Sequence, residues 1–80
     1  MPTWLRERGF RFGIRSADCD EPAHVHVVQG RAIAKFWLAP VGLATSGGYN
    51  RHQLAVISGI VREHEAEFLE KWRESCSEDV

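Results

Sequence analysis

The residues of this chain that could carry chemistry are concentrated in the segment Glu21-Pro22-Ala23-His24-Val25-His26-Val27. In a β-strand, residues two apart point to the same side, so His24 and His26 would project together. Their α-carbons would be roughly 6.5 to 7 Å apart, which lets both imidazoles reach one metal ion. Histidines also titrate near neutral pH and can act as general acids or bases. Three interpretations stay open: metal ligands, a catalytic pair, and structural strand residues.

A metal site would need more ligands than this pair, because zinc normally takes three or four. The nearby candidates are Asp18, Cys19, Asp20 and Glu21, or a histidine brought in by folding. We therefore keep a metal at His24 and His26 as an alternative and expect no cofactor.

Alternating side chains predict the strands that would position the pair. Phe10, Phe12 and Ile14 alternate with polar residues or glycine, which is typical of a strand with one buried face. Acidic residues and Pro22 indicate a loop before the histidines. The predicted strands cover 10–15, 24–28 and 31–38, with a short edge strand at 41–44.

The dipeptide Gln29-Gly30 predicts a two-residue hairpin turn. This turn would pair Val28 with Arg31, His26 with Ile33 and His24 with Lys35. The other face would then form the core, and a shift by one residue would turn both histidines into it. The residues expected in that core are Val25, Val27, Ala32, Ala34, Phe36 and Leu38.

The C-terminal third has the pattern of an amphipathic helix over about 51–75. Asn50 and Gln53 have the spacing of a capping box. His64 falls on the apolar stripe and is expected as a core-edge histidine with one hydrogen-bond partner. We predict one α+β domain over 1–80, with an antiparallel sheet of three to four strands packed against one long C-terminal helix. The apolar stripe of this helix contains Leu54, Ile57, Val61, Phe68, Leu69 and Trp72.

The predicted register leaves one sheet face mostly basic, with one aromatic residue. Such a surface can bind phosphates, stack a base, or pair with an acidic protein. An exposed Trp37 beside Ile33 also suggests an interface, such as that of a homodimer, unless Trp4 folds over it. We predict a partner-binding face that consists of Arg11, Arg15, His24, His26, Arg31, Lys35 and Trp37.

Length and charge favour binding over metabolism. A chain of 80 residues leaves little room for a deep, water-excluding cleft. The net charge of −1 argues against a dedicated nucleic-acid binder. It conceals an asymmetry, because residues 1–35 hold six Lys and Arg against four Asp and Glu, whereas residues 36–80 hold four against seven.

No apolar run reaches the roughly 18 residues that a membrane span requires. Arg6, Glu7 and Arg8 stand where a signal peptide would be apolar. Cys19 and Cys76 are too few to define a secreted disulfide framework, so we expect both thiols to be reduced and the protein to be cytoplasmic.

Several segments together resemble a small bacterial family, the domain of unknown function numbered 4160. Ala23 stands where the family motif has proline. The resemblance implies a component of the toxin–antitoxin kind, encoded beside another small protein, and it supplies no activity for named residues. The segments are Met1-Pro2-Thr3 with Leu5-Arg6, Glu21-Pro22-Ala23-His24-Val25-His26-Val27, Ala34-Lys35-Phe36-Trp37-Leu38 and Phe68-Leu69-Glu70-Lys71-Trp72.

We therefore expect a non-enzymatic protein that regulates or inhibits a protein or nucleoprotein target. It would belong to the toxin–antitoxin kind or to the phage and mobile-element inhibitors, such as anti-CRISPR proteins. The enzymatic alternative is a small ribonuclease-like toxin that uses His24 or His26, with Lys35 or Arg31 stabilising phosphate charge.

Overall fold

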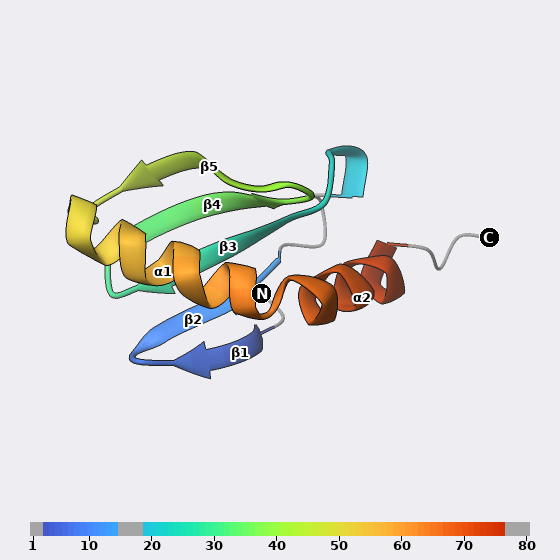
Figure 1. Ribbon diagram of the computed structural model, residues 1–80, viewed down its shortest axis with the longest axis horizontal. Helices are drawn as coiled ribbons and strands as arrows, with labels where there is room; N and C mark the ends of the chain where they lie inside the picture. The colour runs from blue at the N-terminus through green and yellow to red at the C-terminus, as the bar shows by residue number, and fades with distance from the viewer. Residues whose placement is uncertain (1–2, 15–18, 77–80) are drawn as a thin grey trace.

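A computed structural model describes residues 3–14 and 19–76 of the chain. It is an α+β structure, with five strands where three to four were expected and two helices where one was expected (Figure 1). The strands are β1 (Thr3–Glu7), β2 (Phe10–Gly13), β3 (His24–Gln29), β4 (Ala32–Leu38) and β5 (Val41–Gly47). The helices are α1 (Arg51–Glu63) and α2 (Glu65–Cys76).

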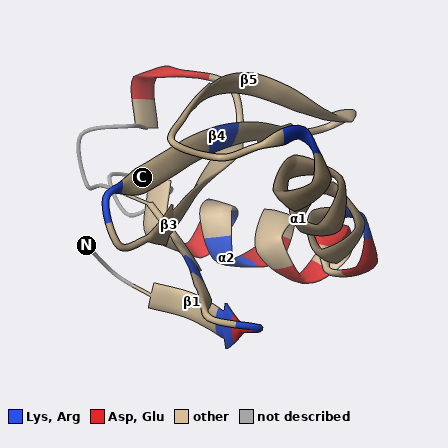
Figure 2. Ribbon diagram, turned by 90° about the vertical axis from the view of Figure 1, so that its left-hand side faces the viewer, with Lys and Arg blue, Asp and Glu red and all other residues tan. Residues whose placement is uncertain are grey.

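The five strands form an antiparallel sheet in which each strand pairs with its neighbour in sequence, in the order β1-β2-β3-β4-β5. Figures 1 and 2 show both helices on the same side of this sheet. We call the side turned away from the helices the outer face. Because side chains alternate along a strand, each strand contributes every second residue to this face.

Strand β1 was not predicted, and its turn explains why it forms. Arg8 and Gly9 join β1 to β2, with φ values of 54° and 83°. Two successive positive φ values are what a type I′ hairpin turn requires. Glycine adopts this conformation readily, whereas an arginine costs roughly 1–2 kcal/mol there. The hairpin places Arg6 directly opposite Arg11.

The predicted register of the β3–β4 hairpin is wrong by two residues. Gln29 pairs with Ala32, so the turn is Gly30-Arg31 and not Gln29-Gly30. The predicted turn would have needed a positive φ at Gln29, whereas the observed turn needs it only at Gly30, where φ is 59°. His24 therefore pairs with Trp37, and His26 with Lys35. A shift of two keeps every side chain on its predicted face.

The predicted core is confirmed in its main members. The helix-facing side chains of β2, β3 and β4 pack against the apolar stripe of the helices. Trp4, the residue suggested as a cover for Trp37, instead contacts Phe68 on the helix side, with ring centroids 5.6 Å apart. The buried cluster consists of Phe10, Phe12, Val25, Val27, Ala34, Phe36, Leu38, Ile57, Ile60, Val61 and Phe68.

The helical segment begins as predicted and then bends at His64. The capping box is present, because Asn50 and Gln53 each accept the other's backbone N–H through a side-chain oxygen. His64 has φ −107° and ψ 17°, away from helical values, and this ends α1. The N–H of Phe68 still donates to the His64 carbonyl at 2.8 Å, so α2 continues directly from the bend.

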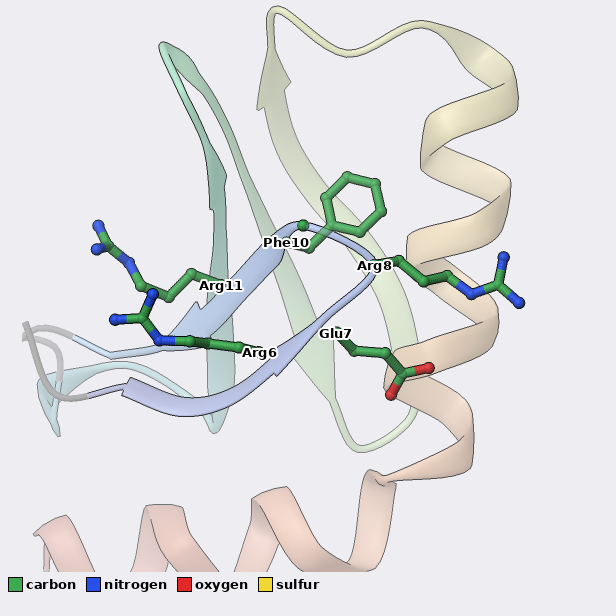
Figure 3. Close-up of a pocket in the computed structure, with 6 residues that line it drawn as sticks. Arg6, Glu7, Arg8, Phe10 and Arg11 are labelled. Carbon is green, nitrogen blue, oxygen red and sulfur yellow. The ribbon is translucent and has the colours of Figure 1, made fainter.

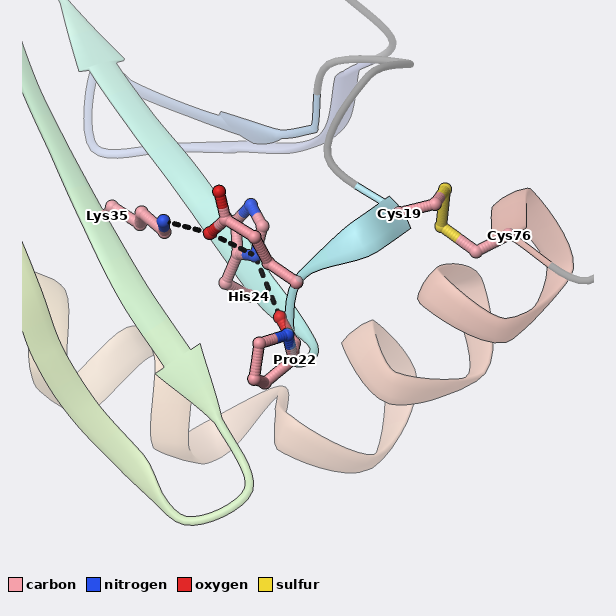
Figure 4. Close-up of polar contacts among 6 residues, drawn as sticks. Cys19, Pro22, His24, Lys35 and Cys76 are labelled. Carbon is pink, nitrogen blue, oxygen red and sulfur yellow. Dashed lines mark hydrogen bonds and ion pairs between the residues drawn. A yellow bond between two sulfur atoms is a disulfide. The ribbon is translucent and has the colours of Figure 1, made fainter.

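The expectation of two reduced thiols is wrong. Cys19 and Cys76 form a disulfide, with their α-carbons 5.5 Å apart. The bond joins the segment that leads into β3 to the C-terminal end of α2 (Figure 4). Among residues 3–14 and 19–76, no helix is long and apolar enough to cross a membrane.

Candidate binding face

The outer face contains the predicted functional residues, but they divide into two groups. The histidine end lies where β3 begins and β4 ends, and consists of Glu21, His24, His26, Lys35 and Trp37. The arginine end lies at the opposite end of the sheet, beside both two-residue turns. It consists of Arg6, Arg11, Gln29, Gly30 and Arg31. Arg15 of the predicted face lies outside the described residues.

The histidine pair is buried, contrary to the prediction of a solvated strand face. His24 is 0% exposed and His26 is 9% exposed. The ring of His24 contacts the rings of His26 and Trp37 at centroid distances of 5.1 and 5.9 Å. Trp72 of α2 approaches it more closely still, at 4.9 Å. An aromatic cluster therefore encloses His24 from both the sheet and α2.

The polar contacts of this end are also internal. Nδ1 of His24 lies 2.9 Å from the carbonyl oxygen of Pro22, close enough for a hydrogen bond (Figure 4). Lys35 donates to the carboxylate of Glu21, and its ammonium stands 4.8 Å from the ring centroid of Trp37. Lys35 is thus already engaged by one anion and one aromatic ring.

These contacts change the chemistry available to the pair. A metal needs further ligands, yet Cys19 is bonded to Cys76, and Asp18 lies outside the described residues. Within the described part of the chain, no three His, Cys, Asp or Glu side chains are grouped closely enough to hold a metal ion. A general acid or base must reach its substrate, which the burial of His24 prevents in this conformation.

His64 lies apart from this pair, at the bend between the two helices. It is a core-edge histidine as predicted, stacked on Phe68 at 5.6 Å, but it contacts two carboxylates and not one. Its Nδ1 lies 3.0 Å from Glu67 and its Nε2 lies 3.4 Å from Glu7 of β1. The hydrogen bond with Glu67 raises the pKa of His64, with a smaller contribution from Glu7. His64 thus ties β1 to the helices.

The arginine end has a different character. Arg6 and Arg11 are cross-strand neighbours, and Figure 3 shows their side chains running alongside one another, whereas Arg8 extends to the other side of the hairpin. A shallow hollow of about 340 Å³ on this end is lined by these two arginines together with Gly9, Val28, Gln29 and Gly30. Two like charges directly opposite one another destabilise a sheet.

No described carboxylate compensates these charges. Within residues 3–14 and 19–76, ion pairs join Glu7, Glu21 and Glu67 to histidines or a lysine, and none joins them to a described arginine. The Nε of Arg11 is buried and has no hydrogen-bond partner in the same part of the chain. Arg6 was missed because β1 was not recognised; the glycine of Arg8-Gly9 before an alternating run is a weak turn signal, because arginine is not a favoured partner for it.

Comparison with known proteins gives one match. A family model described as "Domain of unknown function (DUF4160)" matches residues 9–73, which span β2 to α2. No curated protein and no solved structure is detectably similar. The chain belongs to the DUF4160 family.

Proposed function

We propose that this protein is a non-enzymatic binding protein that regulates or inhibits a macromolecular target through the outer face of its sheet. The target is a protein or nucleoprotein complex, and the role is of the toxin–antitoxin or anti-CRISPR-like kind. The observation that supports this proposal is the arginine end, where Arg6 and Arg11 stand side by side with no described carboxylate against them.

The position of the helices supports the same choice of face. Both lie across the sheet from the arginine end, so no described helix covers that end (Figure 2). Figure 2 also shows acidic segments on both helices, which lie across the sheet from the arginine end. Charges farther apart than about 8 Å are largely screened at physiological salt, so these carboxylates leave the outer face locally basic.

The ribonuclease-like alternative would require His24 or His26 to contact RNA. His24 is 0% exposed and His26 is 9% exposed, and Lys35 contacts Glu21. These observations favour a structural role for the histidine pair instead. Of the predicted partner-binding residues, this proposal keeps Arg11 and Arg31 at the centre of the binding face. It adds Arg6, which was not predicted. Trp37 and Lys35 lie at the border of the binding face.

The test is capture of a partner from host lysate by the tagged full chain, with and without nuclease. The variant is Arg11→Glu with Arg31→Glu, and the matched control is Arg62→Glu with Arg73→Glu on the exposed side of the helices. We expect a stoichiometric partner with the wild type and the control, and its loss from the first variant. Equal recovery with both variants would contradict the proposal.

The same eluates test the enzymatic alternative. If the wild type degrades RNA and a folded His24→Ala variant leaves it intact, the protein is a ribonuclease and the non-enzymatic proposal is wrong. The cytoplasmic location is a separate expectation, and the disulfide bears on it because cytosolic thiols are kept reduced. Trapping of free thiols in intact cells would show which state Cys19 and Cys76 occupy.

A further inference from the structure

We infer that the arginine end is a phosphate-binding site for the backbone of a single-stranded nucleic acid. This inference rests on the proposed function, because it identifies the ligand class of the same face. It starts from the two guanidinium groups of Arg6 and Arg11, which the β1–β2 register places directly opposite each other. Guanidinium groups bind phosphate through two parallel N–H donors, and a phosphate between them would offset their repulsion.

The hollow beside the two arginines supplies room and further donors. Its volume of about 340 Å³ is open to the outer face, and its lining contains backbone of Gly9 and Gly30 together with Gln29. The space beside the α-carbon of Gly30 is open, which lets a ligand approach the backbone closely, and the amide of Gln29 can donate as well as accept.

Arg11 carries the strongest individual observation. Its Nε is buried and lacks a hydrogen-bond partner within the described part of the chain. A buried donor of this kind destabilises the fold when it is left unsatisfied. A phosphate in the hollow would bind the terminal guanidinium N–H groups of Arg11, and its charge would be shared with Arg6.

Extended nucleic acid fits this face better than an acidic peptide. Arg31 occupies the neighbouring turn and is exposed, so cations continue beyond the hollow. Further along the face stands the half-buried ring of Trp37, on the same side of β4 as Ile33. A line of cations with an aromatic ring matches a phosphate backbone with bases. The hollow is shallow, so it imposes little base selection.

The probe is a fluorescein-labelled oligouridylate of about ten nucleotides, followed by fluorescence anisotropy over a range of salt concentrations. Arg6→Gln with Arg11→Gln should weaken binding at least tenfold and reduce the slope of log K against log salt by about 1.4. The control, Arg62→Gln with Arg73→Gln, changes the net charge equally on the other side of the molecule and should bind like the wild type.

Two results with oligonucleotide probes would overturn this inference. One is equal binding by both double variants, and the other is equal binding of an oligonucleotide with an uncharged methylphosphonate backbone. A polyglutamate peptide that binds in place of the oligouridylate would identify an acidic protein partner and would also overturn it. If polyglutamate binds but lysate capture still depends on Arg11 and Arg31, the nucleic-acid inference fails and the proposed function stands. If capture does not depend on these arginines, both fail.

Discussion

The two ends of the outer face contain similar side chains, but these differ in what they contact. At the histidine end, Lys35 binds Glu21 and stands over Trp37, while His24 is enclosed by aromatic rings. At the arginine end, Arg6 and Arg11 face each other without a described carboxylate. The comparison teaches that polar groups whose contacts are satisfied internally are part of the fold. Groups without such contacts are available to a partner.

Removal of the disulfide should have the largest effect on the free energy of unfolding, because the bond fixes the histidine end against α2. Cys19→Ser with Cys76→Ser should lower the free energy of unfolding by about 4 kcal/mol, since the bond closes a loop of 57 residues in the unfolded chain. Urea denaturation of the variant against the wild type measures this loss. An unchanged urea midpoint would show that the disulfide does not stabilise the histidine end.

His24 gives the next largest effect and tests whether the histidine end is structural. His24→Ala should cost about 2–4 kcal/mol, because it leaves a cavity between Trp37 and Trp72. The control is His52→Ala in the exposed first turn of α1, which should change stability by less than about 0.5 kcal/mol. Equal and small losses in both variants, measured by urea denaturation, would remove the distinction between the two ends.

Lys35 gives a smaller effect, because its ion pair is partly solvated. Lys35→Met should cost about 1 kcal/mol through loss of the Glu21 contact and of the cation–π contact with Trp37. Arg31→Met at the arginine end, where no described ion pair is broken, should cost less than about 0.5 kcal/mol. Thermal unfolding of both variants at the same pH measures the two stability losses. A larger loss for Arg31→Met than for Lys35→Met would contradict the difference between the two ends.

His64 should have the smallest effect on stability. It lies outside both ends of the outer face and so provides a separate test of the histidine contacts. Its pKa is raised above 6.5 by Glu67 and Glu7, so its contribution to stability is present below pH 6.5 and is lost as the pH rises through the folded pKa. The thermal midpoint should fall slightly over that interval, and Glu67→Gln should flatten the decline. His52→Gln should leave it unchanged. A midpoint that rises over the same interval would contradict the assignment.

Much of this fold follows from local patterns in the sequence. The capping box at Asn50, the alternation of β2 to β4 and the apolar helix stripe each depend on residues close together in the chain. The face of His24 and His26 was also predictable, because an error of two residues in a hairpin register preserves side-chain direction.

What could not be predicted depends on contacts between distant residues. Cys19 and Cys76 meet only because α2 ends beside the segment that leads into β3. The burial of His24 requires Trp72, which lies 48 positions later in the chain. The pairing of Arg6 with Arg11 is local and was missed for a different reason, because it depends on a type I′ turn at Arg8-Gly9 and arginine is a poor residue for the required φ. Sequence patterns thus identified the chemical groups without identifying which of them were already engaged.

The most direct test of the account is a map of where a ligand contacts the outer face. Proton–nitrogen correlation spectra of the labelled full chain, titrated with the oligouridylate, would provide it. The account predicts the largest shifts at the Arg8-Gly9 and Gly30-Arg31 turns and at the side-chain Nε of Arg11, with small shifts at His24 and in both helices. Largest shifts at His24 and Lys35 would contradict it, because they would place binding among residues whose contacts are internal to the fold.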